Sequence, residues 1–410
     1  MQYQTDKHVL ANGMILLGEP MEAVQSAAFG FMIPAGAAVL RQGCCGAANV
    51  IADWLFRGAG NYTSRRLSDK LDGLGLHRSS SVDTSHIAVG AALETGNLPE
   101  ALKLYADIIQ RPRLTDQEFQ PAKQLAIEGV RALDDNPRQN VMLKLREQFY
   151  PAPLGRSIVG SINELENLSA EDTRQIIKHN FNLSNTIFAV AGKYDFESVA
   201  ARMDDMFQGQ PRELPQPVRL AEEGAKYRHI QNEGAQVHIG LMTGTVTPAD
   251  DDYYNARVAV AVLSGGMSAR LFTEVREKRG LCYAIGARYH GLKEAAGIMC
   301  YAGTTPDKAQ ETVDVIMSEF SRLGDGISEE ELHRAKIGLE SSLILQSESS
   351  TSRAGAIAGD YYMLGRIRSL DEIKTKIEET TVDSVLQFLR TYRFREFTVV
   401  SIGPKKVTVK

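Results

Sequence analysis

Short apolar segments bounded by turn residues recur along the chain and predict β-strands. Residues 8–20 (HVLANGMILLGEP) place Asn12 and Gly13 between two apolar runs, a pattern typical of a β-hairpin because this pair favours a tight turn. Four further apolar segments are predicted strands, at residues 27–39, 186–192, 235–246 and 397–403.

Apolar residues spaced by three or four positions predict helices after these strands. Residues 98–112 show this period and end at a proline, and residues 380–392 have a similar pattern. Residues 328–346 begin with Ser328 followed by Glu331, which is the spacing of a capping box. Strands followed by helices, twice along the chain, predict an α+β fold of two homologous domains. In each domain we expect an antiparallel sheet with helices packed on one face.

The two halves of the chain resemble each other. LTDQEFQPAK at 114–123 parallels ISEEELHRAK at 327–336, and the Leu-Gly-Arg triplet at 154–156 recurs at 364–366. A separation of about 210 residues indicates duplication of one unit rather than a short-period repeat. Between the halves lies a proline-rich, charged stretch that is typical of a linker. We therefore divide the chain into an N-terminal domain (1–210), a linker (211–228) and a C-terminal domain (229–410).

Composition narrows the classes of function. The formal net charge of −5 and the pI near 6.0 give no reason to expect binding to nucleic acid or to an anionic membrane. No run approaches the roughly 18 apolar residues of a transmembrane helix. The four cysteines include no Cys-x-x-Cys pair, and the first residues lack the pattern of a signal peptide. We expect a cytoplasmic protein, or a periplasmic one if a leader has been removed.

The most specific motif is LSGGMSARLFTEVREKRGLCYAI at residues 263–285. This segment resembles the second-half signature of the insulinase/pitrilysin (M16) family of zinc metallopeptidases, and the resemblance extends over almost the whole chain. In active members of that family an arginine and a tyrosine, seven residues apart, bind the substrate across from the zinc. The resemblance assigns these roles to Arg276 and Tyr283.

The chemistry of the two side chains agrees with what the resemblance implies. An arginine offers several fixed donors to a peptide carbonyl. A tyrosine hydroxyl can donate to the oxyanion that forms when water attacks that carbonyl. The alternative for Arg276 is an ordinary surface ion pair with a neighbouring acid.

The zinc motif of the same family is degenerate in this chain. Where members carry His-x-x-Glu-His, the segment GAANVIADWLFRG has Asn49, Ala52 and Asp53. An asparagine oxygen replaces an imidazole nitrogen, and Ala52 cannot act as a general base. Glu128 lies where the family places its third ligand. Three oxygen donors would suit Mg²⁺ or Ca²⁺ better than zinc, and the alternative, which we favour, is a hydrogen-bonded polar cluster without a metal.

These features leave three functions open. The hypothesis that we favour is a non-catalytic, substrate-binding subunit of a heterodimeric peptidase, in which Arg276 and Tyr283 complete the zinc site of a homologous partner that carries His-x-x-Glu-His and acts on peptides. The second is a homodimeric peptide-binding or scaffold protein without proteolysis. The third is an autonomous hydrolase that uses Asn49, Asp53 and Glu128 on an unusual metal.

Overall fold

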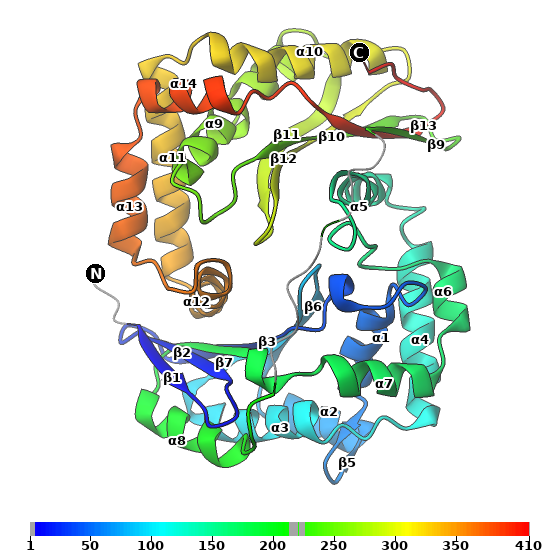
Figure 1. The fold of residues 1–410 in the computed structure, drawn as a ribbon, viewed down its shortest axis with the longest axis vertical. Coiled ribbons are helices and arrows are strands. Elements are labelled where there is room, and N and C mark those ends of the chain that lie inside the picture. Colours follow the sequence, from blue (N-terminus) through cyan, green and yellow to red (C-terminus); the bar gives the residue numbers. More distant parts are fainter. Residues whose placement is uncertain (1–4, 213–219, 221–225, 410) are drawn as a thin grey trace. The chain divides into compact units, whose positions relative to one another are not determined.

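The computed structural model describes residues 5–212, 220 and 226–409. Contacts between residues divide this part of the chain into two compact units, each built around one β-sheet (Figure 1). Unit 1 contains residues 5–132, 152–212 with residue 220, and 346–368, and unit 2 contains residues 133–151, 226–345 and 369–409. Of the linker predicted at 211–228, residues 213–219 and 221–225 lie outside the described residues.

In the described part of the chain, the main sheet of unit 1 has six strands. Their spatial order is β1 (Asp6–Val9), β2 (Ile15–Pro20), β8 (Ile187–Gly192), β3 (Ser26–Ile33), β7 (Ile87–Glu94) and β6 (His77–Val82). Neighbouring strands are antiparallel except β2 and β8, which run parallel. The predicted hairpin is confirmed, because β1 and β2 pair across a turn in which Gly13 has a φ of 90°, a left-handed conformation that glycine adopts easily.

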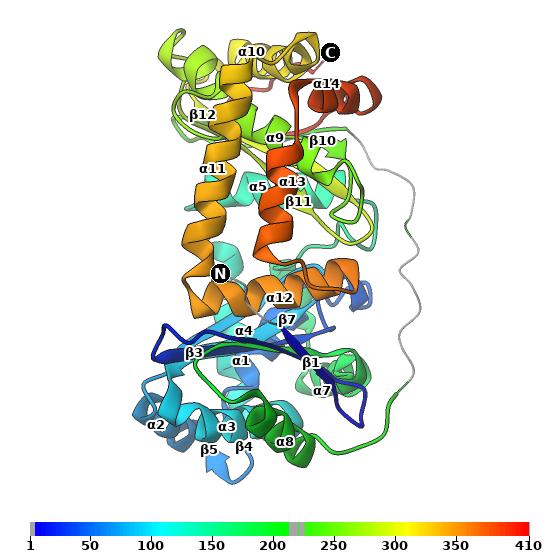
Figure 2. The same cartoon turned by 90° about the vertical axis from the view of Figure 1, so that its left-hand side faces the viewer.

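Helices cover both faces of this sheet (Figure 2). The other elements of unit 1 are η1 (Ala37–Val39), α1 (Ala47–Trp54), β4 (Gly58–Ala59), β5 (Tyr62–Thr63), α2 (Ser64–Gly73), η2 (Thr95–Asn97), α3 (Leu98–Gln110), α4 (Asp116–Arg131), α6 (Ile162–Asn167), α7 (Ala170–Asn180), η3 (Leu183–Asn185), α8 (Phe196–Met206) and α12 (Ser350–Leu364). Because side chains alternate along a strand, Leu16 and Phe188 lie in the main core on the α3 side. Leu17 and Ala189 point the other way and pack against Ile357 of α12.

The sheet of unit 2, over the residues described, has five strands. Their order is β11 (Cys282–Gly291), β12 (Ala296–Thr304), β10 (Val237–Thr245), β13 (Thr398–Gly403) and β9 (Tyr227–Gln231). Its other elements are α5 (Pro137–Phe149), α9 (Tyr253–Ser264), the π-helical turn η4 (Phe272–Glu277), α10 (Ala309–Arg322), η5 (Leu323–Asp325), α11 (Glu329–Ser347), α13 (Leu370–Glu379) and α14 (Val382–Thr391). Ile239 and Ile298 face the main core with α9 and α10. On the opposite face Gly240 lets α5 approach closely, since an added Cβ would lie 3.1 Å from Leu145.

The two sheets have the same topology. The order β2-β8-β3-β7-β6 in unit 1 corresponds to β9-β13-β10-β12-β11 in unit 2, strand for strand along the chain. In both, the first strand of this set runs parallel to the last, and all other neighbours are antiparallel. The predicted α+β class and two homologous domains are confirmed, and the shared topology agrees with duplication of one unit.

Each unit includes one helix from the other half of the sequence. Helix α5 covers β10 and β13 of unit 2, and α12 covers β8 and β3 of unit 1. A buried ion pair helps to fix α12, because Arg353 binds Glu19 of β2 at 2.5 and 2.6 Å. The compact units are therefore discontinuous in sequence, and each sheet has a helix on its second face. The linker predicted at residues 211–228 implies neither the discontinuous units nor the helix on the second face of each sheet.

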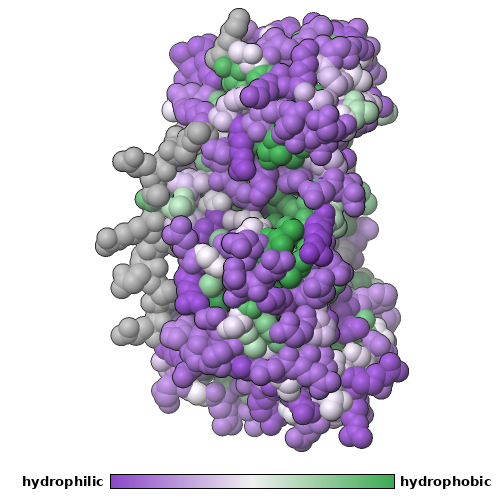
Figure 3. Space-filling model, turned by 90° about the vertical axis from the view of Figure 1, so that its right-hand side faces the viewer, coloured by the Kyte–Doolittle hydropathy of each residue, from purple (hydrophilic) through white to green (hydrophobic). Residues whose placement is uncertain are grey.

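On the side drawn in Figure 3, hydrophilic residues cover most of the area and hydrophobic residues gather in a few patches. No helix in the described ranges is both long and apolar enough to cross a membrane. Apolar burial is concentrated instead in the cores of the two units.

Candidate functional site

Helix α1 carries the three positions that correspond to the degenerate zinc motif. The helix begins after Gly46, which has a φ of 88° and whose Cβ, if present, would lie 2.5 Å from the carbonyl oxygen of Val159. The apolar face of α1 is buried, and Trp54 packs on Phe119 of α4 with the ring centroids 4.9 Å apart. This packing fixes α1 against α4, and it leaves the two polar motif positions partly exposed.

Two of the three positions lack the chemistry of a zinc site. Asn49 Nδ2 donates a hydrogen bond to the backbone carbonyl oxygen of Ile158, so the donor end of the amide is engaged within the protein. Ala52 contributes a buried methyl group at the position of the motif glutamate. Ala52 offers no proton acceptor at the position where the motif glutamate would act on water.

The third position, Asp53, already has a cation beside it. Its carboxylate forms an ion pair with Arg57, one helical turn later. The Arg57 guanidinium also lies 3.5 Å from the carboxylate of Glu118 on α4, so one positive charge serves two carboxylates. An arginine therefore provides the charge that a metal ion would otherwise bring to this place.

Glu128, the remaining candidate ligand, is exposed on α4. It accepts a hydrogen bond from Gln124 Nε2 at 3.0 Å, an ordinary contact between residues four apart on a helix. Within the ranges that the structure describes, no group of three His, Cys, Asp or Glu side chains could hold a metal ion. Helices α1 and α4 pack together, but they do not assemble Asp53 and Glu128 into such a group. The residues at these positions do not fit a zinc ion.

The signature segment at 263–285 forms one continuous structure in unit 2. It contains the end of α9, a turn, η4, a chain reversal and the start of β11. In η4 the Lys278 N–H donates to the carbonyl oxygen of Thr273, five residues earlier, at 2.9 Å. Such π-helical turns are frequent at functional sites. The reversal uses Gly280, with a φ of 57°, and it places the candidate arginine before the turn and the candidate tyrosine after it.

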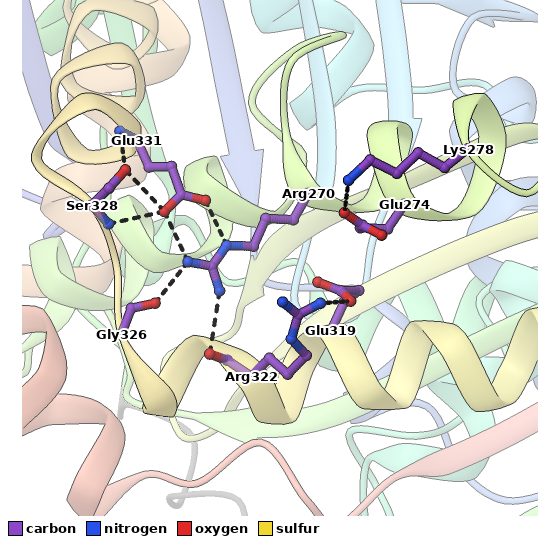
Figure 4. Close-up of polar contacts among 8 residues, drawn as sticks. All are labelled: Arg270, Glu274, Lys278, Glu319, Arg322, Gly326, Ser328 and Glu331. Atoms are coloured by element: carbon purple, nitrogen blue, oxygen red, sulfur yellow. Dashed lines mark hydrogen bonds and ion pairs between the residues drawn. The ribbon is translucent and has the colours of Figure 1, made fainter.

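Arg270 fixes this segment to helix α11 (Figure 4). Its guanidinium binds both carboxylate oxygens of Glu331, at 2.6 and 2.8 Å. It also donates to the carbonyl oxygens of Gly326 at 2.7 Å and Arg322 at 3.2 Å. Glu331 forms the predicted capping box with Ser328, and the hydrogen bonds from Arg270 lower the pKa of Glu331 to about 2. Arg270 is thus a structural residue of the signature.

Arg276 has no acidic partner among the residues described, whereas its neighbours do. Lys278 and Arg279 both bind Glu274, at 2.6 and 2.7 Å, and the hydrogen bond from Lys278 is the main cause that lowers the pKa of Glu274. Arg276 is exposed, and its guanidinium lies 4.8 Å from the ring centroid of Phe272. A cation–π contact orients a guanidinium without neutralising it. The structure therefore does not contain the surface ion pair that we considered for Arg276.

Tyr283 is the extra residue of a β-bulge at the start of the edge strand β11. The register with β12 shifts between Cys282 and Ala284, which leaves Tyr283 outside the ladder. Its side chain is 46% exposed, and its hydroxyl donates to Oε1 of Gln236. Burial, and to a smaller degree Cys282, raise the pKa of Tyr283, so the hydroxyl keeps its proton at neutral pH. A bulge of this kind re-aims a side chain away from the sheet ladder.

The two predicted residues lie at the same end of the unit 2 sheet. The chain reversal joins η4 to β11, and these two elements are in contact. Burial raises the pKa of the Cys282 thiol, and the charge of Arg276 reduces this rise. The charge of Arg276 thus reaches Cys282, the residue that precedes Tyr283 in the chain.

Sequence reasoning missed several residues beside Tyr283. Gln236 lies at the start of β10, and the ring Nδ1 of His238 is 2.9 Å from the hydroxyl of Tyr301 on β12. The guanidinium of Arg138, at the start of α5, lies 4.9 Å from the Tyr301 ring centroid. These residues meet only through strand pairing and through the packing of α5. Apolar alternation predicts that 235–246 is a strand but does not identify its neighbours, so no local signal could have found them.

Strand β6 forms a polar edge of the unit 1 sheet. Over the described ranges it pairs with β7 on one side only, and residues 77–81 are all exposed. An edge of this kind offers backbone N–H and C=O groups to an added extended chain. Helix α1 contacts β6, so this edge adjoins the degenerate motif.

Two family models match the chain. Residues 19–161 match insulinase (peptidase family M16), and residues 167–339 match the peptidase M16 inactive domain. An uncharacterized zinc protease of Rickettsia bellii is 24% identical over 405 residues, which cover 97% of each chain. A solved structure of a peptidase M16 inactive domain from Pseudomonas fluorescens has a TM-score of 0.89 at 19% identity, covering 99% of this chain and 100% of that one. A protease from Helicobacter pylori has a TM-score of 0.87 at 18% identity, covering 98% and 99%.

Proposed function

Because the chain belongs to the insulinase-type peptidase family M16, we propose that it is a non-catalytic, substrate-binding subunit of a metallopeptidase that acts on peptides. In this proposal a homologous partner with an intact His-x-x-Glu-His motif holds the zinc, and this chain contributes Arg276 and Tyr283. One observation carries the proposal. The polar motif positions Asn49 and Asp53 are engaged by protein contacts, whereas the exposed guanidinium of Arg276 has no acidic partner among the residues that the structure describes.

A guanidinium without an acidic partner in the described ranges and a phenol at the same end of the sheet together suit the backbone of a peptide. A carbonyl oxygen carries only partial charge, so it competes poorly for an arginine that a carboxylate already holds. Arg276 avoids this competition because Glu274 is bound by Lys278 and Arg279. Tyr283 adds a hydroxyl that remains protonated at neutral pH. Together the two side chains can bind a carbonyl oxygen and stabilise charge that develops on it.

The edge strand β6 supports peptides as the ligand class. An extended peptide can add to this edge through main-chain hydrogen bonds, which depend little on the peptide's sequence. The exposed side chains of β6 include three consecutive serines at 79–81, which present small polar groups rather than an apolar pocket. Binding of this type favours unstructured peptides, because a folded protein has few backbone groups available for pairing.

The partner is tested by recovering the full chain, tagged in its native host, under gentle conditions. We expect one homologous chain of similar size that carries His-x-x-Glu-His, in stoichiometric amount, with zinc bound to the complex. Recovery of this chain alone as a self-dimer contradicts the heterodimer and favours the homodimeric peptide-binding alternative. A metal bound at one ion per chain in the isolated protein, and lost in Asp53→Ala, would instead favour the autonomous hydrolase.

A further inference from the structure

Two tyrosine hydroxyls converge above Gly303 on β12. A Cβ added to this glycine would lie 2.8 Å from the Tyr301 hydroxyl and 3.0 Å from the Tyr283 hydroxyl. Gly303 pairs with His238 on one neighbouring strand and with Ala284 on the other. The missing side chain therefore leaves the space in which both phenols sit, at the place where the bulge directs Tyr283.

The hydrogen-bond partners of the two phenols are different. The Tyr301 hydroxyl is 2.9 Å from Nδ1 of His238, and both groups are partly or fully buried. Burial lowers the pKa of His238 and raises the pKa of Tyr301 to about 12, so this pair is neutral at pH 7. The half-exposed Tyr283 hydroxyl donates instead to Oε1 of Gln236. In this arrangement the proton of Tyr283 points toward Gln236 and not toward a ligand.

We propose that Gln236 is a positioning residue that sets whether the Tyr283 hydroxyl donates to a bound peptide or accepts from it. With Oε1 toward the phenol, Tyr283 uses its proton within the protein and offers lone pairs to a peptide N–H. When the amide turns by half a rotation, its NH₂ group donates to the phenol oxygen, and the Tyr283 proton is released toward a peptide carbonyl. A primary amide is suited to this role because it holds a donor and an acceptor on one rotatable group. This inference rests on the proposed peptide-binding function.

Substitutions at Gln236 separate the two states. In Gln236→Glu the carboxylate can only accept at neutral pH, so it keeps the Tyr283 proton. In Gln236→Ala the hydroxyl is free to donate to a ligand. Titratable and charged groups that act on one another here include Cys282 on β11, His238 on β10, Tyr301 on β12, Arg138 on α5 and Arg276 on η4. Wild-type protein measured at each pH corrects for their titration.

The experiment measures binding of fluorescein-labelled peptides from a casein digest to the full chain by fluorescence anisotropy. We expect Gln236→Glu to weaken binding by about threefold to tenfold at pH 7.5, the size of one hydrogen bond, and to recover as the pH falls through about 4.3. Gln236→Ala should lose much less affinity than Gln236→Glu, because it frees the hydroxyl without withdrawing its proton. In a Tyr283→Phe background the effect of Gln236→Glu should disappear.

Other outcomes overturn the inference. If Gln236→Glu weakens binding equally with and without the Tyr283 hydroxyl, the new charge acts directly on the peptide. If Gln236→Ala weakens binding as much as Gln236→Glu, the amide itself contacts the peptide. If Tyr283→Phe and Arg276→Ala both bind as the wild type does, the proposed function fails and this inference fails with it. Loss of binding in those two variants with no effect of any Gln236 substitution rejects the inference alone. Thermal unfolding of each variant confirms that it is folded.

Discussion

The two units share a strand order, yet they differ in whether their candidate site residues have ionic partners. In unit 1 the polar residues of α1 already have partners within the protein. Asp53 and Glu118 share the charge of Arg57, and the Asn49 amide donates a hydrogen bond to the backbone. In unit 2 the arginines of the signature segment are of two kinds, those with several hydrogen-bond acceptors and those without an acidic partner in the described ranges. Arg270 is bound to four acceptors, whereas Arg276 is exposed with an aromatic ring as its contact.

This difference separates arginines that hold the fold from Arg276, which we propose is available to a ligand. A guanidinium with several acceptors loses stabilising contacts when it is removed. A guanidinium without an acid contributes little to folding, and its charge remains available for binding. Variants of the arginines should therefore form a graded series in stability, with Arg276 at its lower end although it is expected to matter most for function.

The largest effect is expected for the buried pair between Arg353 and Glu19. Glu19→Gln leaves the Arg353 guanidinium buried without its counter-ion and should lower the free energy of unfolding by about 3–5 kcal/mol. Urea unfolding monitored by circular dichroism measures this change. The double variant Glu19→Gln, Arg353→Met removes both charges and should recover part of the loss. A single variant within about 1 kcal/mol of the wild type would show that this pair does not fix α12.

Removal of Arg270 should have an intermediate effect. Arg270→Met abolishes the hydrogen bonds to Glu331 and to two backbone carbonyls, and we expect a loss of about 1–3 kcal/mol in the free energy of unfolding. The matched control is Lys278→Met, because Glu274 keeps its contact with Arg279 in that variant. Equal stability of the two variants in urea would contradict a structural role specific to Arg270.

The ion pair between Arg270 and Glu331 should make the free energy of unfolding depend on pH. The pKa of Glu331 is about 2 in the folded protein, against an ordinary value of 4.5, mainly because Arg270 donates hydrogen bonds to its charged form. A carboxyl group with a lowered folded pKa stabilises the protein above its unfolded pKa, and this contribution is lost as the pH falls from about 4.5 towards about 2. The difference in unfolding free energy between wild type and Glu331→Gln should therefore shrink over this window. Added salt should reduce this difference in unfolding free energy, because the carboxylate is partly exposed. A constant difference from pH 6 to 2.5 would exclude this linkage.

The smallest change in stability is expected for Arg276→Ala. The side chain is exposed and has no acidic partner in the described part of the chain, so the free energy of unfolding should change by no more than about 0.5 kcal/mol. Urea unfolding beside Arg270→Met provides the comparison. A loss as large as that of Arg270→Met would mean that Arg276 holds the fold and is not reserved for a ligand.

Local patterns in the sequence predicted the elements, but they did not predict that each unit includes a helix from the other half of the sequence. The Asn12-Gly13 hairpin and the Ser328–Glu331 capping box depend on residues close in the chain, so they could be predicted from spacing alone. The positions of α5 and α12 depend on contacts across long stretches of chain, such as Arg353 with Glu19, and no local period encodes such a pairing. For the same reason the parallel pairs of β2 with β8 and of β13 with β9 were not predicted.

The candidate site was predicted in part for similar reasons. Arg276 and Tyr283 were assigned by a family resemblance, and the structure explains their exposure through the π-helical turn and the bulge. The partners Gln236 and Arg57 were missed. Arg57 lies one helical turn after Asp53, so a systematic search for charge pairs four residues apart would have found it. Gln236 reaches Tyr283 only through the pairing of β10, β12 and β11, which the sequence does not reveal.

In the proposed complex this chain contributes a peptide-binding arginine, and the zinc lies in another chain. The most direct test measures casein-peptide cleavage by the complex recovered with its homologous partner, using wild type, Arg276→Ala and the neighbouring control Arg279→Ala at equal zinc content. We predict that Arg276→Ala lowers the rate by about 100-fold, as loss of one group that stabilises an oxyanion does. Arg279→Ala should stay within about twofold of the wild type, because Lys278 still binds Glu274. A complex with Arg276→Ala that cleaves as fast as the wild type would contradict the account.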